Sequence, residues 1–402
     1  MIRAQRSAGY ALAVLTFINL FNYLDRWVVA AVVESIKRSE LHLTDTELGL
    51  VGTGFIFVYT LTSPIFGSLG DRRARPPLIA LGVALWSIAT ALAGFARGFA
   101  SLFAARSAVG VGEAAYGTIA PALLADSFPI ERRGRVFAVF FAAIPIGSAA
   151  GYILGGLVDK YFGWRAAFWI AGTPGLVLAL LVLFVHDPLR GAQDGQNVQQ
   201  AGGYLHLLRN APYMLTVVGY GAYTFALGGL AFWMPAFLER SRGMARSEAT
   251  VTFGAIALVT GFLGTFAGGW LGDFFLKWTK QSYLWVSGIA TLIAAPITYV
   301  ALTDHRHSVY ITAIVIAELL VFMSTGPVNS AIVNAVAPVE RATALGLSVF
   351  VMHLIGDIPS PPLIGKISDA TSLEHAFLIV PVAFLLGGAI WTFAGWRGER
   401  HA

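Results

Sequence analysis

Long apolar segments recur along this chain of 402 residues, and they restrict it to folds that lipid can solvate. A helix of about 20 apolar residues crosses the ~30 Å hydrocarbon core of a bilayer. The chain is 56% hydrophobic and 12% charged, whereas soluble domains carry about 25% charged residues. Since only helices satisfy their backbone groups in single spans, we predict an all-α membrane protein. Twelve spans are expected, at residues 9–36, 48–70, 77–97, 100–126, 136–158, 165–186, 211–238, 249–272, 282–302, 308–335, 342–367 and 374–396.

A Gly-x-x-Gly-Asp motif occurs twice, at equivalent places in the two halves of the chain. Gly67–Asp71 ends the second apolar segment, and Gly269–Asp273 ends the eighth. Pro129–Arg132, after the fourth segment, is likewise echoed by Pro338–Arg341 after the tenth. Internal repeats of this kind are typical of secondary transporters. We therefore predict two pseudo-symmetric six-helix bundles. The expected divisions are residues 1–187, a cytoplasmic linker at 188–210, and residues 211–402.

The basic residues indicate the orientation of the chain. The formal net charge is +5, which fits loops on the cytoplasmic side rather than a nucleic-acid partner. The densest basic clusters, at residues 72–75 and 132–135, fall on the same side as both termini. We therefore expect an inner-membrane protein with both termini in the cytoplasm. The first apolar segment contains Asp25 and Arg26 and is too long and too charged for a cleaved signal peptide.

Charged residues lie deep within the apolar spans of the first half. Asp25 falls near the middle of the first span, and Arg106 and Glu113 fall in the fourth. A charge at the bilayer centre costs at least ~2.5 kcal/mol, so each group needs a partner or water. Arg106 and Glu113 are two turns, or about 10 Å, apart on one helix face. They cannot pair tightly with each other, so partners on another helix are expected.

These charges suggest a site for proton coupling. Burial and a neighbouring cation act on a carboxyl group in opposite directions, and together they can poise it to bind and release a proton. We predict that Asp25 and Glu113 carry the proton and that Arg106 anchors an anionic substrate. The alternative is a static ion pair that only joins helices. Arg26 is rotated by about 100° from Asp25 and is either a further substrate ligand or a snorkelling or capping side chain. Tyr59 and Tyr116 are candidate substrate contacts or packing residues.

The second half contains a separate polar set. Glu318 lies in the tenth span, and His353 and Asp357 lie one turn apart in the eleventh. Prolines at 359, 361 and 362 must break or kink that helix and free backbone carbonyls. We predict substrate-binding roles for Glu318, His353 and Asp357 at a hinge. The alternative is a kink whose polar groups satisfy one another.

A charged loop pair on the cytoplasmic side suggests a gate. Asp71 ends a helix beside basic residues and, in the same half, a second loop is rich in arginine. A charge pair between these loops that breaks and re-forms would act as a two-state gate; the alternative is an orientation signal. The predicted gate residues are Asp71, Arg72, Arg73, Arg75, Arg132, Arg133 and Arg135.

Glycines in the fifth span repeat at a spacing that allows helices to pack closely. Gly147, Gly151, Gly155 and Gly156 lie on a small-residue face of the segment. Such faces let two backbones approach each other. We expect these glycines to serve helix packing rather than substrate contact.

Several of these motifs resemble signatures of the major facilitator superfamily. Gly67–Pro76 is similar to its loop signature Gly-x-Leu-x-Asp-Arg-x-Gly-Arg-Arg, with Ala74 and Pro76 departing from it. Arg106–Gly110 resembles a fourth-span motif linked to proton coupling. Gly147–Gly156 resembles the fifth-span glycine motif common among antiporters. The resemblance covers the whole chain and implies a monomeric transporter that uses protons and no other cofactor or metal.

A finer resemblance is to the Spinster family of lipid transporters. Asn22–Arg26 is similar to the first-span motif of that family, and Gly110–Pro121 to the fourth. His353–Pro361 and Leu363–Gly365 resemble its eleventh-span motif. This resemblance implies proton-coupled export or efflux of lysophospholipids or sphingoid-base phosphates, and the short loops indicate a bacterial member.

The sequence therefore predicts a proton-coupled secondary transporter of amphipathic lipids that works by rocker-switch alternating access. Its partners would be the cargo and membrane lipids. The alternative is a proton-coupled exporter of small drugs or other organic solutes on the same fold. An enzyme is not expected, because no nucleophile has a matched base and the eight histidines form no metal motif. We expect Asp25→Asn and Glu113→Gln to abolish pH-dependent transport without affecting folding. Neutralising Arg106 should weaken binding of a phosphorylated lipid more than of its dephosphorylated form.

Overall fold

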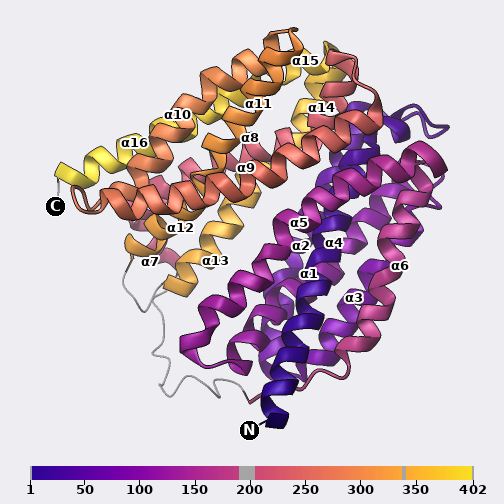
Figure 1. Ribbon diagram of the computed structural model, residues 1–402, viewed down its shortest axis with the longest axis vertical. Coiled ribbons are helices and arrows are strands. Elements are labelled where there is room, and N and C mark those ends of the chain that lie inside the picture. The colour runs from indigo at the N-terminus through magenta and orange to yellow at the C-terminus, as the bar shows by residue number, and fades with distance from the viewer. Residues whose placement is uncertain (1, 190–203, 337–340, 401–402) are drawn as a thin grey trace. The chain divides into compact units, whose positions relative to one another are not determined.

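Figure 1 shows a chain built of helices, most of them long. The computed structural model describes residues 2–189, 204–336 and 341–400. Within these residues, twelve helical segments are long and apolar enough to cross a membrane. The prediction of an all-α membrane protein with twelve spans is therefore confirmed. By contact density the chain divides into unit 1, Met1–Asn197 with Met244–Ala255, and unit 2, Val198–Gly243 with Ile256–Ala402.

Unit 1 is formed by long helices that pack closely at small residues. Its helices are α1 (Ile2–Lys37), α2 (Asp45–Arg72), α3 (Arg75–Ala93), α4 (Phe99–Ser127), α5 (Ile130–Phe162) and α6 (Trp164–Val182). A side chain added at Gly147 would come within 2.4 Å of the Leu20 carbonyl oxygen, and one at Gly151 within 2.5 Å of that of Leu24. The predicted packing role of these glycines is thus confirmed, and the close contact fixes how α5 lies against α1.

Gly151→Ala is expected to destabilise unit 1. Its new methyl group would meet the Leu24 backbone of α1, which cannot move as a side chain can, and overpacking of this kind costs typically ~1–3 kcal/mol. The matched control is Gly67→Ala in α2, where a new methyl group would meet no heavy atom within 4 Å. Thermal unfolding in detergent should show a lower Tm for Gly151→Ala, and an unchanged or raised Tm for Gly67→Ala, because alanine favours a helix. Equal Tm values for the two variants would contradict this packing argument.

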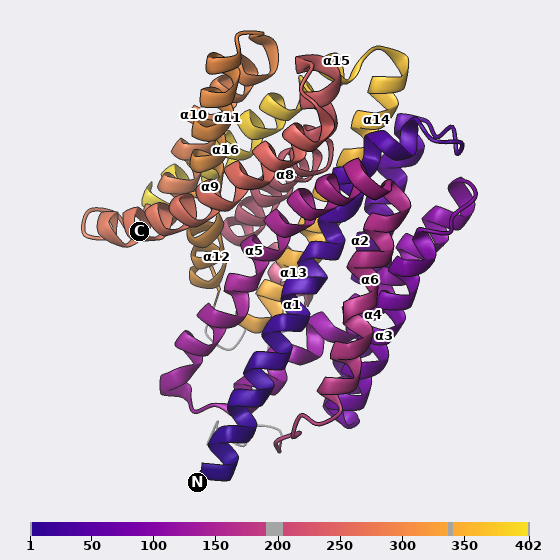
Figure 2. The same ribbon diagram turned by 45° about the vertical axis from the view of Figure 1, so that its right-hand side comes forward.

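Unit 2 contains shorter helices because two of its spans are interrupted. Figure 2 shows several of them from a second angle. The helices are α7 (Tyr204–Arg209), α8 (Ala211–Arg242), most of α9 (Arg246–Phe275), α10 (Ser282–Thr303), α11 (His307–Phe322), α12 (Thr325–Asn334), α13 (Arg341–Met352), the π-helical turn η2 (His353–Asp357), α14 (Ser360–Ala370), α15 (Leu373–Ala376) and α16 (Ile379–Arg400).

The two interruptions have an identifiable cause in proline. In the eleventh span, the α-helix becomes η2 and stops before Pro359, so the predicted break is confirmed. The tenth span is also broken, between α11 and α12, which we did not predict. Pro327 has no N–H to donate to the Met323 carbonyl one turn earlier. Gly268 packs against that carbonyl so closely that an added side chain would lie 1.9 Å from its oxygen.

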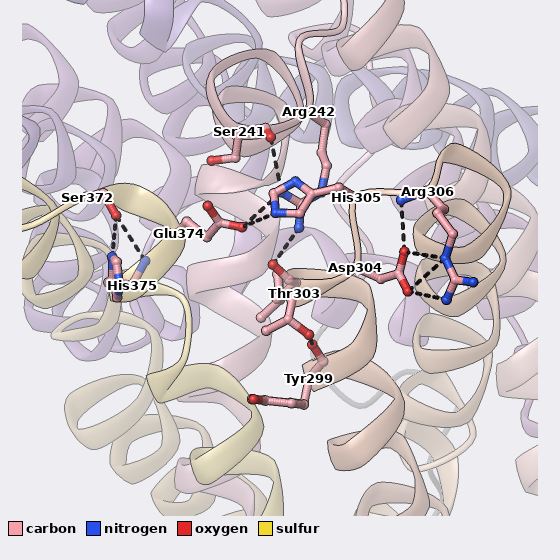
Figure 3. Close-up of polar contacts among 11 residues, drawn as sticks. Ser241, Arg242, Tyr299, Thr303, Asp304, His305, Arg306, Ser372, Glu374 and His375 are labelled. Carbon is pink, nitrogen blue, oxygen red and sulfur yellow. Dashed lines mark hydrogen bonds and ion pairs between the residues drawn. The ribbon is translucent and has the colours of Figure 1, made fainter.

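A buried arginine side chain bonds to several connecting segments at one end of unit 2 (Figure 3). The Arg242 side chain is 1% exposed, and its Nη1 donates to Glu374 Oε1 at 3.0 Å. Its Nη2 donates to the Leu302 carbonyl at the end of α10. One guanidinium thereby joins the end of α8 to the segments around α10 and α15. Nearby, hydrogen bonds from the Arg306 side chain and backbone lower the pKa of partly exposed Asp304 to about 2.

Candidate functional site

The first and fourth spans bring Asp25 and Arg106 into a buried ion pair. Arg106 Nη1 lies 3.0 Å from Asp25 Oδ1, and Nη2 donates to the Asp25 carbonyl oxygen at 3.4 Å. The Thr90 hydroxyl of α3 donates to Asp25 Oδ2 at 2.6 Å. Asp25 is 1% exposed and Arg106 is 0% exposed. Three helices therefore share one desolvated charge pair, and each oxygen of the carboxylate has a donor.

The neighbouring residue, Arg26, forms a second ion pair with Glu113. Arg26 Nε donates to Glu113 Oε2 at 2.7 Å. The Glu113 side chain is fully buried, but the Arg26 side chain is 20% exposed. The sequence left the role of Arg26 open, and the structure assigns it to Glu113 rather than to snorkelling or capping. Because Arg106 and Glu113 are two turns apart, the adjacent residues of α1 pair at two different levels of α4.

Aromatic rings surround the more exposed of these two cations. The Arg26 guanidinium carbon lies 4.7 Å from the Tyr23 ring centroid and 5.4 Å from those of Phe55 and Tyr59. Cation–π attraction holds a guanidinium over a ring without consuming all of its N–H donors. Arg26 can therefore remain in place while it exchanges hydrogen-bond partners.

Several buried polar atoms of this network have spare hydrogen-bonding capacity. Among the described residues, no partner is found for Glu113 Oε1, Arg106 Nε, Asn22 Nδ2 or Ser107 Oγ. A buried polar atom without a partner is costly and therefore uncommon. Each of these atoms can therefore take one further hydrogen-bond partner.

The two predicted tyrosines lie in different surroundings. Tyr59 faces Arg26, as described above. Tyr116 is 2% exposed, donates its hydroxyl to the Leu15 carbonyl at 2.6 Å and packs edge-on against Trp86. Tyr116 is thus part of the core of unit 1 in this structure.

The polar residues predicted in the second half lie in unit 2 in two places. Glu318 of α11 is 7% exposed and accepts a hydrogen bond from Thr260 at 3.1 Å. It borders a small pocket whose other walls include Leu230, Met234 and Thr298. His353 Nδ1 lies 2.8 Å from Asp357 Oδ1 within η2.

η2 itself packs closely on α8. A side chain added at Gly228 of α8 would come within 2.5 Å of the Asp357 Cβ. The pair of His353 and Asp357 therefore sits where the helix is interrupted, as the hinge prediction requires, whereas Glu318 lies on another helix with its own partner.

The structure describes the side chains of only some of the predicted gate residues. Arg75 is buried, with its Nη1 2.6 Å from Asp126 Oδ2 and its backbone N–H donating to Asp187. Arg75, the first residue of α3, is thus paired with Asp126 near the end of α4, and its role in a gate stays a prediction. Arg72, Arg73 and Arg132 are exposed. The side chains of Asp71, Arg133 and Arg135 lie outside the described residues, so the gate remains a prediction.

One ion pair of unit 1 was missed at the sequence level. Arg246, at the start of α9, lies 3.2 Å from Asp159 of α5, and the Ser35 hydroxyl bonds to both side chains. The three residues stand at the ends of separate helices. Their proximity follows from packing, and no sequence motif marks it.

Comparison with known proteins identifies the family. The Major Facilitator Superfamily model matches residues 15–360. Protein spinster of Drosophila melanogaster is 33% identical over 379 residues, covering 91% of this chain and 62% of its own. Protein spinster homolog 1 of Homo sapiens is 37% identical over 384 residues, covering 89% of this chain and 72% of its own. This chain therefore spans about six tenths of the Drosophila relative.

Solved structures show the same fold. A bacterial homolog to the human lysosomal transporter Spinster, in an inward-facing and unoccupied conformation, has a TM-score of 0.88 at 24% identity, with 97% of each chain covered. The nucleoside transporter NupG has a TM-score of 0.77 at 13% identity, with 96% of this chain and 98% of NupG covered. Together with the twelve spans, these matches show that the chain belongs to the Spinster family of the Major Facilitator Superfamily and is a multi-pass membrane transporter, not an enzyme.

Proposed function

We propose that the chain is a proton-coupled secondary transporter of amphipathic lipids of the lysophospholipid or sphingoid-phosphate class. Transport would proceed by rocker-switch alternating access in the inner membrane, by a monomer with both termini in the cytoplasm. The observation that carries the proposal is Glu113, a fully buried carboxylate whose ion-pair partner, Arg26, is partly exposed. Glu113 would then exist in two states, one paired with Arg26 and one in which Arg26 binds another anion.

The coupling would arise from competition for Arg26. An anionic headgroup that binds the Arg26 guanidinium withdraws it from Glu113. The buried carboxylate is then left without a counter-charge, which costs several kcal/mol unless it takes up a proton. When the headgroup leaves, Arg26 returns to Glu113 and the proton is released. One residue thereby links the charge of the cargo to the proton.

Asp25 and Arg106 would form a second ion pair, which stays closed while Arg26 exchanges its partner. Both are fully buried and bonded to each other, so Arg106, predicted as the headgroup anchor, would contact cargo only after the pair opens. We therefore propose that Arg26 makes the first contact with the headgroup and that Arg106 follows. Tyr23 and Tyr59, which flank Arg26, would border the region where the apolar chain begins.

The cargo class can be tested by transport into proteoliposomes under an imposed pH gradient. The panel would contain a sphingoid-base phosphate, its dephosphorylated form, a lysophospholipid and a compact organic cation. We expect gradient-driven flux for the phosphorylated amphiphiles and little for the compact cation. Flux of the compact cation alone would replace the lipid assignment with a drug or solute exporter.

A further inference from the structure

A cavity of about 790 Å³ lies in unit 2, lined in part by the last turns of α16 and the connection from α9 to α10. Its walls come from α8, α10, α12 and α16, and they include Leu215, Leu284, Ala331 and Ala394. The last three are less than a tenth exposed, so one part of the wall is apolar and formed by buried helix faces, while Thr216, Gln281 and Asn334 add polar groups to the lining. The volume is in the range of ~300–1,000 Å³ that small-molecule sites occupy.

Two cations stand among the lining residues, and both are available for a ligand. Lys280 follows α9, and Arg397 is in the last turns of α16. Both are exposed, and neither has an ion-pair or hydrogen-bond partner among the residues that the structure describes. The nearby carboxylate of Glu399 is taken by the Thr279 hydroxyl and the Trp285 indole, at 2.7 and 2.9 Å. No described lining residue is acidic, so the charges of Lys280 and Arg397 exceed the single nearby charge of Glu399 and the cavity carries net positive charge.

Exposed aromatic residues indicate the depth of this end of the unit in a membrane. Trp270, Phe274 and Trp278 form a ring cluster at the end of α9, and they are 64%, 36% and 66% exposed. Trp396 of α16 is 41% exposed. Tryptophan is enriched where headgroups meet hydrocarbon. The cavity, which shares α16 and the α9–α10 connection with these residues, therefore lies at headgroup level.

We propose that this cavity binds the headgroup region of an anionic phospholipid of the surrounding membrane. The phosphate would lie between Lys280 and Arg397, and the start of the acyl chains would follow the apolar wall at Leu215 and Leu284. Basic pockets between membrane helices are known to bind anionic headgroups. This lipid is a bound partner rather than cargo. The site lies wholly within unit 2 and does not depend on the ion pairs of unit 1.

The test compares two double variants at the same end of unit 2, each of which replaces two cations by glutamine. The full chain in phosphatidylcholine nanodiscs would be titrated with phosphatidylglycerol, and bound lipid would be measured by native mass spectrometry. Each cation near an anionic lipid is worth about a fivefold change in affinity, so Lys280→Gln with Arg397→Gln should weaken binding roughly 25-fold. The control is Lys277→Gln with Arg400→Gln. These two cations lie over the Phe274 and Trp396 rings, at 5.2 and 3.8 Å, and outside the lining. This control should bind as the unaltered chain does.

A second variant tests the apolar part without changing charge. Ala335→Trp would fill the cavity next to α12, and it should also abolish selective binding of phosphatidylglycerol. An equal loss of phosphatidylglycerol binding in both double variants would show that charge alone attracts the lipid, and it would overturn the proposal. Retained binding in Ala335→Trp would place the lipid elsewhere. Inorganic phosphate that displaces the lipid at equal concentration would overturn the assignment of a lipid as ligand.

Discussion

Gradient-driven transport by the Glu113→Gln variant is expected to fall to the level of protein-free liposomes, while the fold is retained. Glutamine keeps the shape of the side chain, and its carbonyl oxygen can still accept the bond from Arg26 Nε, which is 2.7 Å long in the structure. It cannot bind or release a proton. Because Arg26 is partly exposed, water can solvate the cation once its charged partner is gone. The expected change in unfolding free energy is therefore about 1 kcal/mol.

The measurement compares cargo flux with and without an imposed pH gradient. Glu113→Gln should give the same flux in both conditions. A matched control is Glu34→Gln, which removes another buried carboxylate of unit 1, 3.5 Å from exposed Arg38. This control should keep its response to the gradient. A full response in Glu113→Gln would show that the proton is carried elsewhere.

The second large effect is expected in stability, at the pair of Asp25 and Arg106. Asp25→Asn leaves the Arg106 guanidinium fully buried without a counter-charge, and breaking a buried pair in this way costs about 3–5 kcal/mol. The structure thus revises the sequence-based expectation that Asp25→Asn would leave folding intact. The double variant Asp25→Asn with Arg106→Gln removes both charges and should recover most of the loss. Thermal unfolding of the two single variants and the double variant would give the coupling energy.

The neighbouring ion pair of Arg26 and Glu113 provides a comparison for this double-mutant cycle. Glu113→Gln makes the same kind of change but leaves a partly exposed cation, Arg26, so its Tm should fall less than that of Asp25→Asn. If Asp25→Asn is as stable as the unaltered chain, then Arg106 is not desolvated as the structure has it. If the double variant is less stable than both single variants, then the ion pair is not the source of the cost.

The sequence was most informative where a local rule decides the structure. Apolar length predicted the twelve spans, and Pro359 predicted the break after η2. The small residues at Gly147 and Gly151 predicted a close helix contact. Each of these follows from the chemistry of residues near one another in sequence, so no knowledge of tertiary packing was needed.

The site was only partly predictable because its contacts join separate helices. Hydropathy identified Asp25, Arg106 and Glu113 as costly charges, yet it could not pair Arg26 with Glu113. That pairing depends on the rotation and depth of α1 against α4. Thr90, whose hydroxyl bonds to Asp25, is an ordinary residue in sequence terms. Pro327 is a local signal for the break in the tenth span, but a weak one, because proline is common in membrane helices.

Proton coupling through Glu113 is tested most directly by recording lipid and proton movement in the same liposomes. A gradient of a sphingoid-base phosphate would be imposed without any pH gradient, and a pH-sensitive dye inside the vesicles would report proton flux. The proposed competition for Arg26 predicts that lipid flux drives proton flux in the unaltered protein and that Glu113→Gln abolishes the proton signal. Lipid flux at an unchanged internal pH in the unaltered protein would contradict proton coupling.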